Sequence, residues 1–208
     1  MSNSISPAVI NRMPRYYRYL EDLLKTGVER ISSKSLSEKM HLTASQIRQD
    51  LNNFGGFGQQ GYGYNVKYLH DEIGKILGLD KKHNIIIIGI GRIGQAIANY
   101  QNFKALGFNM IGFFDIDKKI IGKKFLDIKV RDIKELDDFI KQNKVDIVAL
   151  TLSKGEAKVM AEKVLNLGVK AIWNFALVDL EVPSDVVVEN VHLSESLLRL
   201  SYRITKLG

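Results

Sequence analysis

Three glycines, Gly89, Gly91 and Gly94, are the residues of this 208-residue chain whose type and spacing point most directly to chemistry. They follow the isoleucine run at 85 to 88 and stand where a helix can begin. There the first glycine permits a tight turn, the second lets a pyrophosphate approach the backbone, and the third lets the helix pack on the strand. Free amides at the helix start would hold the phosphates. The pattern predicts a dinucleotide site, whose turn also contains Ile90, Arg92 and Ile93.

A carboxylate at the expected separation supports this prediction. Asp115 follows Gly94 by about 20 residues, at the end of the next expected strand. A carboxylate there accepts hydrogen bonds from ribose hydroxyls and repels a 2′-phosphate, which favours NAD and NADH over NADP. A structural turn, or a site for another nucleotide such as coenzyme A, remains an alternative.

The sequence shows no recognisable catalytic set. A dehydrogenase needs a supported proton donor or acceptor near the nicotinamide, and none of the four histidines has a recognisable carboxylate to orient its ring. Because the chain contains no cysteine, any redox response must come through a bound molecule, and we expect no metal. We therefore expect no enzyme, with an NAD-dependent oxidoreductase carrying an accessory winged-helix domain as the alternative.

A second candidate site lies in the expected helix at 43 to 52, which Thr43 and Gln46 open as a capping pair. Apolar residues at helical spacing face inward, so polar ones face outward. Arginine suits guanine edges and glutamine suits adenine edges, so this helix could read the major groove. A solvated polar face, or a protein contact, is the alternative. The side chains expected at DNA are Thr43, Ser45, Gln46, Arg48, Gln49 and Asn52.

The surrounding pattern predicts a winged helix. Helices are expected at 14 to 26 and at 35 to 40, the latter capped by Ser35 with Glu38. The alternating glycines and aromatics at 54 to 64 indicate a hairpin whose tip carries Gln59 and Gln60, both suited to minor-groove contact. One more helix, at 68 to 79, leads into a second domain.

The second domain alternates strands and helices, which is typical of a doubly wound parallel sheet of Rossmann type. Strands are expected at 85 to 88, 109 to 114, 145 to 150, 170 to 174 and 185 to 188, and helices at 92 to 105, 132 to 142, 154 to 167 and 194 to 205. The predicted fold class is α/β, with a winged-helix domain at 1 to 80, an NAD(H)-binding domain at 81 to 190 and a C-terminal helix at 191 to 208.

The composition sets wider limits. The net charge of +7 is mild evidence for a polyanionic partner, but scattered lysines make most of it a solubilising surface. No apolar run approaches the roughly 20 residues of a membrane span. The N-terminus also lacks a signal-peptide layout. We expect a cytoplasmic protein that has no membrane partner.

With these residues in place, the chain resembles the Rex family of redox-sensing transcriptional repressors along nearly its whole length. The matching segments are Pro-Arg-Tyr-Tyr-Arg-Tyr-Leu (14 to 20), Gln-Ile-Arg-Gln-Asp-Leu (46 to 51), Phe-Gly-Gly-Phe-Gly-Gln-Gln-Gly-Tyr-Gly-Tyr (54 to 64), Gly-Ile-Gly-Arg-Ile-Gly (89 to 94), Phe-Phe-Asp-Ile-Asp (113 to 117), Trp-Asn-Phe-Ala (173 to 176) and Val-Glu-Asn-Val (188 to 191).

The resemblance implies a homodimer that binds palindromic double-stranded operators when NADH is scarce and releases them when NADH rises. It also implies that the C-terminal helix is domain-swapped between the partner's domains, and that Tyr100 lies near the nicotinamide. The cofactor wall would be completed by Thr151, Leu152, Asn174 and Phe175. A polar switch between subunits would join Arg18 to the segment that contains His192, Leu193 and Glu195.

Some positions depart from the family pattern. Many relatives carry lysine where Gln49 stands, and often a basic residue where Gln60 stands. We therefore expect a shifted operator preference, with Gln49 favouring adenine where lysine would favour guanine. Relatives often carry aspartate where His192 stands, so either Glu195 replaces that partner of Arg18 or His192 makes the switch pH-sensitive. Proline is common where Ser153 and Leu177 stand. A DNA-binding protein whose second domain only dimerises is a third alternative.

Overall fold

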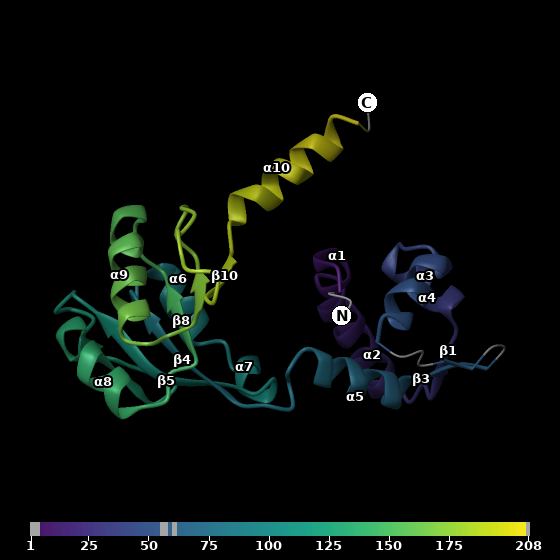
Figure 1. Cartoon of the computed structure of the whole chain (residues 1–208), viewed down its shortest axis with the longest axis horizontal. Coiled ribbons are helices and arrows are strands. Elements are labelled where there is room, and N and C mark those ends of the chain that lie inside the picture. The colour runs from purple at the N-terminus through teal and green to yellow at the C-terminus, as the bar shows by residue number, and fades with distance from the viewer. Residues whose placement is uncertain (1–4, 55–57, 60–61, 207–208) are drawn as a thin grey trace. The chain divides into compact units, whose positions relative to one another are not determined.

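The chain divides into two compact units, Met1–Lys81 and Lys82–Gly208 (Figure 1). The structure is a computed structural model, and it describes residues 5–54, 58–59 and 62–206.

The first unit packs five helices against a small antiparallel sheet. Its core is built from side chains with no exposed surface, including Tyr16, Leu20, Leu36, Ile47 and Leu69. The helices are α1 (Pro7–Ile10), α2 (Met13–Lys25), α3 (Ser33–Met40), α4 (Ala44–Asn52) and α5 (Val66–Ile76). The strands are β1 (Arg30–Ile31), β2 (Gly58–Gln59) and β3 (Gly63–Asn65), in the order β1-β3-β2. This is a helix-turn-helix followed by a hairpin, as the sequence predicts.

Two details of the first unit differ from the sequence prediction. The helix expected at 35 to 40 begins at Ser33, and its cap is Ser32, whose hydroxyl accepts the Ser35 amide at 3.0 Å. The predicted Ser35 cap was therefore wrong, because the chain leaves β1 in an extended conformation that puts Ser32 at the helix entrance. Strand β1 was not predicted; it pairs with β3 and extends the wing.

The second unit is built on a seven-stranded sheet in the order β10-β9-β8-β4-β5-β7-β6. Neighbours are parallel except β6, which runs antiparallel to β7. The chain moves outward from β4 through β5 to β7, then returns to place β8 on the other side of β4. The topological switch point therefore lies between β4 and β8, where such sheets bind ligands at the carboxyl edge. The strands are β4 (His83–Ile88), β5 (Phe108–Asp115), β6 (Lys124–Phe125), β7 (Ile128–Asp132), β8 (Ile147–Leu150), β9 (Ala171–Asn174) and β10 (Val187–Asn190).

Helices cover both faces of the sheet, which explains why β4 is apolar at consecutive positions. Ile86 and Ile88 pack in a core cluster with residues of α8 and α9, whereas Ile85 and Ile87 pack in a second cluster with residues of α6 and α7. The helices are α6 (Arg92–Ala98), α7 (Asn102–Ala105), the 3-10 turn η1 (Ile133–Glu135), α8 (Leu136–Gln142), α9 (Lys154–Asn166) and α10 (Leu193–Ile204).

The second unit also corrects the sequence prediction. The single helix expected at 92 to 105 is broken after α6, where the Asn99 side chain donates to the Gln95 carbonyl at 2.9 Å and the backbone leaves the helical path. The hairpin of β6 and β7 was missed because its turn uses Leu126 and Asp127 at positive φ rather than glycine. The last strand lies later than the expected 185 to 188, at Val187–Asn190.

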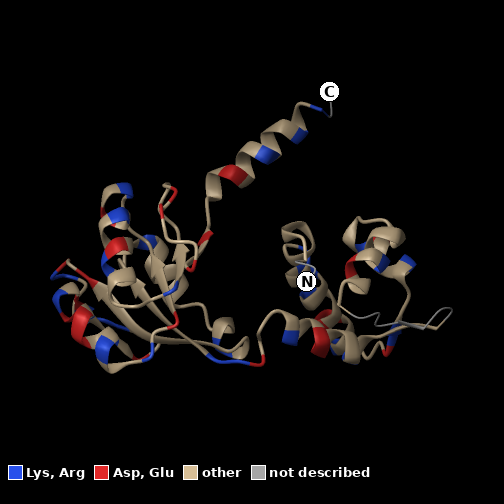
Figure 2. Cartoon of the chain, viewed as in Figure 1, with Lys and Arg blue, Asp and Glu red and all other residues tan. Residues whose placement is uncertain are grey.

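Helix α10 confirms the helix expected at 194 to 205, but none of its residues is buried. Figure 1 shows it (yellow) extending from the end of β10. Basic and acidic residues both occur along α10, α8 and α9, as the blue and red segments of the ribbon show (Figure 2). Within the described ranges, no helix is both long and apolar enough to cross a membrane.

Candidate functional site

The three glycines form the turn between β4 and α6, and the structure gives each a different task. Gly89 has φ +91°, and a Cβ there would lie 2.7 Å from both Leu152 Cδ2 and the Thr151 carbonyl oxygen. A Cβ at Gly94 would overlap the Gly89 carbonyl oxygen and lie 2.9 Å from Thr151 Oγ1. The Thr151 hydroxyl donates to that same carbonyl of Gly89. The turn is therefore packed tightly against the end of β8.

Gly91 is different, because a Cβ at this position would meet nothing within 4 Å. Its φ of −74° and ψ of −163° are open to any residue, so the backbone does not require glycine here. The open space lies in front of the first amides of α6, which have no acceptor within their own helix. A pyrophosphate fits this position, since the helix start attracts anions and no side chain fills the space.

Asp115 ends β5 beside this turn and is half-buried. Its Oδ2 accepts the Ile90 amide at 2.5 Å, and its Oδ1 accepts the amides of Ile116 and Asp117 at 2.7 and 2.8 Å. A carboxylate offers about four acceptor positions. These bonds therefore fix Asp115 at the crevice and leave it able to accept one more hydrogen bond, as from a ribose hydroxyl.

A cavity of about 510 Å³ opens at this carboxyl edge of the sheet. Such a volume is within the usual range of small-molecule sites. Of the predicted cofactor residues, it is lined by Gly89, Gly91, Asp115, Thr151 and Leu152. Its other wall comes from residues that the sequence prediction missed, Ile133, Gly155, Glu156, Val159 and Met160. All of these except Ile133, which lies in η1, belong to α9, and which part of that helix faces the crevice depends on the sheet.

The remaining predicted cofactor residues lie elsewhere. Tyr100 follows α6, is 50% exposed and packs its ring on Phe103 with centroids 4.7 Å apart. Asn174 is fully buried, and its amide donates at 2.8 Å to the Val178 carbonyl and to Asn190 Oδ1. The Phe175 ring packs against Trp173 with centroids 4.6 Å apart. The described structure thus brings none of these three side chains into the lining of the cavity, nor Ile90, which is fully buried, nor Arg92 and Ile93, which are exposed at the start of α6.

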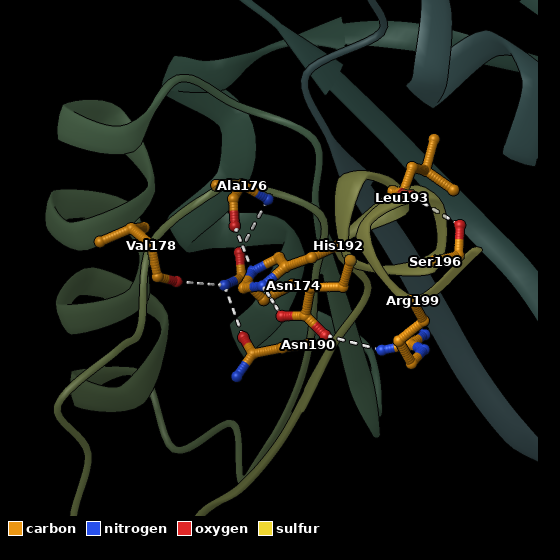
Figure 3. A network of polar contacts seen from close by, with 9 residues as sticks. Asn174, Ala176, Val178, Asn190, His192, Leu193, Ser196 and Arg199 are labelled. Carbon is orange, nitrogen blue, oxygen red and sulfur yellow. Dashed lines mark hydrogen bonds and ion pairs between the residues drawn. The ribbon is translucent and has the colours of Figure 1, made fainter. Parts of the chain in front are cut away.

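Asn174 supports the loop that anchors α10 (Figure 3). Its Oδ1 accepts the Ala176 amide at 3.0 Å, and the Ala176 carbonyl lies 3.1 Å from His192 Nε2. His192 Nδ1 lies 2.9 Å from Glu195 Oε1. Both ring nitrogens therefore face acceptors, and only the doubly protonated ring donates to both.

The charges around His192 agree with that geometry. The hydrogen bond that His192 donates to Glu195 is the main cause that raises the pKa of His192 above its ordinary 6.5, with weaker contributions from the Ala176 carbonyl and the Asp179 charge. In turn, His192 lowers the pKa of Glu195, which also faces Arg199 at 3.4 Å. Two alternatives were expected here, Glu195 as the partner of Arg18 or His192 as a pH-sensitive residue; in the structure Glu195 contacts His192, and both alternatives stay predictions.

Two other predicted switch residues are surface residues. Leu193 is 65% exposed at the start of α10, and Arg18 is exposed on α2 of the first unit.

In the first unit, α4 presents part of the predicted DNA-contacting set. Ser45, Gln49 and Asn52 are exposed. Arg48 is exposed as well, with Nη1 donating to Ser33 Oγ at 3.1 Å. Thr43 is occupied as the helix cap, since its hydroxyl accepts the Gln46 amide at 3.1 Å. Of the wing residues, Gln59 belongs to β2 and Gln60 lies outside the described residues.

The Gln46 side chain points inward. Its Nε2 donates to Asp50 Oδ1 at 2.9 Å, so the predicted capping pair with Thr43 forms on one side only. Asp50 is fully buried, and sequence reasoning missed it. The sequence did carry a signal: Asp50 and Leu51 follow Ile47 by three and four residues, so all three lie on the same buried face of the helix.

No cluster of three or more possible metal-ligating side chains occurs in the part of the chain that the structure describes. Together, the winged helix and the glycine-turn crevice define a class of protein: a DNA-binding unit joined to a dinucleotide-binding unit. Two family models match accordingly, one described as "Putative DNA-binding protein N-terminus" at residues 4–52 and one as "CoA binding domain" at residues 80–178.

Full-length relatives narrow that class. The chain is 59% identical over 202 residues to the redox-sensing transcriptional repressor Rex of Thermoanaerobacter sp. (strain X514), covering 97% of this chain and 90% of the relative. It is 57% identical to Rex of Clostridium novyi (strain NT), with 96% and 95% covered. The chain belongs to the Rex family of redox-sensing transcriptional repressors.

Solved structures agree with this membership. A crystal structure of RSP in complex with β-NAD⁺ and operator DNA has a TM-score of 0.92 and 58% identity, with 97% of this chain and 93% of that chain covered. RSP in complex with β-NADH has a TM-score of 0.91 and 55% identity, with 98% and 96% covered. The predicted two-domain fold is confirmed. So is the prediction of a regulator rather than an enzyme, because the relatives are repressors.

Proposed function

We propose that this chain is a transcriptional repressor that binds palindromic operator DNA through α4 and its wing, and that NADH in the glycine-turn crevice releases it. The observation that carries the proposal is the open position at Gly91, next to the carboxylate of Asp115, in a chain that also exposes a helix-turn-helix face. A solved relative at a TM-score of 0.92 holds both β-NAD⁺ and operator DNA, which supports both halves.

The crevice favours a dinucleotide without a 2′-phosphate. Gly91 leaves room for the pyrophosphate, and the amides at the start of α6 hold it. Asp115 then accepts the ribose hydroxyls and repels an additional phosphate, so NADH and NAD bind in preference to their phosphorylated forms.

The difference between NADH and NAD is a charge on the nicotinamide ring. We assign Thr151 and Leu152, which line the cavity, to the nicotinamide end. These side chains carry no charge, and burying an unpaired cationic ring among them costs free energy. The neutral reduced ring avoids that cost, so NADH binds more tightly.

The active form is a homodimer whose C-terminal helices are exchanged. Helix α10 has only 12 residues, and a helix of that length is marginal in water without a packed face. Its apolar side chains are each more than half exposed, so they need a partner surface, which a second copy supplies. They are Leu193, Leu197, Leu198, Leu200, Tyr202 and Ile204. A twofold dimer presents two α4 helices to two half-sites, which matches a palindrome.

Domain roles follow from this assignment. Residues 1 to 80 read DNA, residues 81 to 190 bind NAD(H), and residues 191 to 208 form the exchanged helix. The polar switch between subunits involves Arg18 and the segment from His192 to Glu195. Because operator DNA is its target, the protein acts in the cytoplasm.

NADH must shift the dimer between two states to regulate it. To move the population from mostly DNA-bound to mostly released, NADH must bind the released state roughly 10²- to 10⁴-fold more tightly than the DNA-bound state, which is about 3 to 5.5 kcal/mol. Two cofactor sites in one dimer share that requirement, so each needs only about half of it.

An electrophoretic mobility assay with operator DNA tests the proposal. NADH, NAD and NADPH are added separately to the full chain, and the retained fraction is measured. We expect NADH to release DNA, NAD to be tolerated and NADPH to act only at much higher concentration. Equal retention at every ratio of NADH to NAD would overturn the proposal, and turnover of nicotinamide absorbance with an alcohol or acid would indicate an oxidoreductase instead.

A further inference from the structure

A buried carboxylate lies on the helix to which we assign base contact. Asp50 of α4 has no exposed surface, and its carboxylate accepts hydrogen bonds from three side chains. Arg12 donates through Nε to Oδ2 at 2.6 Å and through Nη2 to Oδ1 at 2.7 Å. The Tyr16 hydroxyl donates to Oδ2, and the Gln46 amide donates to Oδ1, both at 2.9 Å. We name these four residues the Asp50 cluster.

The Asp50 cluster joins two helices that are far apart in sequence. Arg12 stands at the N-cap position of α2 and Tyr16 lies near the start of that helix, whereas Gln46 and Asp50 lie on α4. A bidentate arginine–carboxylate pair is directional, unlike the apolar contacts of the surrounding core. The cluster therefore restricts rotation of α4 about its own axis, which apolar packing alone restrains less.

The carboxylate is held in its charged form. Burial alone would raise the pKa of Asp50, but the hydrogen bonds from Arg12, Gln46 and Tyr16 outweigh it and keep that pKa below the ordinary 3.8. At neutral pH Asp50 is thus an anion paired with Arg12, and each of its carboxylate oxygens accepts two hydrogen bonds. Removing a single partner leaves a buried charge partly unsatisfied, which is strongly unfavourable.

Gln46 contributes to this cluster rather than to the exposed face. It is half-buried and donates its amide inward, whereas Ser45, Gln49 and Asn52 on the same helix are exposed. A side chain reads an adenine edge by offering both its amide and its carbonyl. One of the two amide hydrogens of Gln46 is given to Asp50, and this bond points the half-buried side chain inward, so the residue is poorly suited to that role.

We propose that Asp50 and Gln46 are positioning residues for operator recognition, setting the rotation of α4 so that Ser45, Gln49 and Asn52 meet the base edges. This inference rests on the proposed function, namely DNA reading by α4. It reassigns Gln46 from base contact to helix positioning and gives the buried ion pair a role in specificity as well as in stability.

The test compares Gln46→Ala with Gln49→Ala, a matched glutamine on the same helix. Affinity of each full-length variant is measured by fluorescence anisotropy against operators in which every half-site base pair is changed in turn. Gln46→Ala should weaken binding to all operators by a similar factor and keep their order of preference. Gln49→Ala should change that order. A Gln46→Ala variant whose preference changes at one base pair would overturn the inference.

Asp50→Asn supplies a second readout. A rotated α4 would misplace a base-edge contact, so Asp50→Asn should weaken operator binding roughly 10- to 100-fold. Binding to non-specific DNA, which depends on phosphate contacts, should change much less, and NADH affinity should stay the same. Equal loss for operator and non-specific DNA would mean that the cluster is only structural.

Folding and function are kept separate in this design. If Asp50→Asn fails to fold by circular dichroism, Tyr16→Phe takes its place, because it removes one donor and keeps the ring. Wild-type protein that does not distinguish operator from non-specific DNA would refute the proposed function itself, whereas a base-specific effect of Gln46→Ala would refute only the positioning role.

Discussion

Alanine at Gly91 and alanine at Gly94 should have opposite effects, although both residues belong to one motif. A Cβ at Gly91 meets nothing within 4 Å and the backbone there is ordinary, so Gly91→Ala should fold normally. Replacing a glycine in a permitted conformation commonly stabilises by about 0.4–1 kcal/mol, because the unfolded chain loses freedom. The melting temperature of Gly91→Ala should therefore stay the same or rise slightly.

Binding of NADH should nevertheless fall. The added methyl group occupies the space in front of the α6 amides, where the pyrophosphate must approach. Losing one hydrogen bond to a charged group costs about 1.5–3 kcal/mol. That cost corresponds to roughly 10- to 100-fold weaker binding. The concentration of NADH that releases operator DNA should rise by the same factor.

Gly94→Ala should behave in the other way. Its Cβ would overlap the Gly89 carbonyl and press on Thr151 Oγ1 at 2.9 Å, so the backbone must shift. Overpacking of this kind costs about 1–3 kcal/mol. For a domain of this size, that lowers the melting temperature by roughly 3 to 15 °C. Calorimetry and NADH titration of both variants check this, and the reasoning fails if Gly91→Ala loses stability as Gly94→Ala does or keeps wild-type NADH affinity.

Four further predictions use other parts of the chain. Asp115→Asn removes the charge and replaces one acceptor oxygen by an amide group, so the preference for NADH over NADPH should fall about tenfold in titrations; an unchanged ratio would contradict it. Gln49→Lys should move operator preference from adenine toward guanine, and identical preferences in both proteins would refute the base assignment. The two hydrogen bonds of the protonated His192 ring, to Glu195 and to the Ala176 carbonyl, anchor α10; this His192 anchor should be fully present below pH 6.5, the ordinary value of the His192 pKa, and lost as the pH rises through the raised value. An NMR titration of the His192 ring should show that raised pKa, and Glu195→Gln should return it toward 6.5, so equal values in the two proteins would exclude the anchor. Leu197→Glu places a charge on the exposed apolar face of α10 and should shift the dimer toward monomer in analytical ultracentrifugation, whereas an unshifted dimer would place the interface elsewhere.

Some of the fold was predictable because it is encoded by neighbours in sequence. The glycine turn after β4 could be recognised because a buried strand, a tight turn and a helix start all leave local signals. Thr43 as the cap of α4 was also predictable, since a cap bonds only a few residues ahead. The hairpin of β6 and β7 was not, because its turn at Leu126 and Asp127 lacks the usual turn residues.

Contacts between distant residues behaved differently. Arg12 reaches Asp50 across 38 residues, and nothing in the spacing of either residue indicates the other. Asn174 was predicted as a cofactor contact, but its amide donates to Asn190 across 16 residues as well as to the Val178 carbonyl, and so supports the loop next to α10. In both cases a polar residue in a functional motif is held by internal hydrogen bonds.

By itself, the sequence determined that this protein combines a helix-turn-helix with a dinucleotide turn, because periodicity, caps and glycine spacing act over one or two turns of chain. Tertiary structure alone decided which polar side chains remain free to meet a ligand. Gln46 is turned inward by Asp50, which Arg12 holds from 38 residues away, and Asn174 is held by Asn190 across 16 residues, whereas Gly91 and Gln49 stay open. A buried polar group must be hydrogen-bonded, and its partner can come from anywhere in the chain.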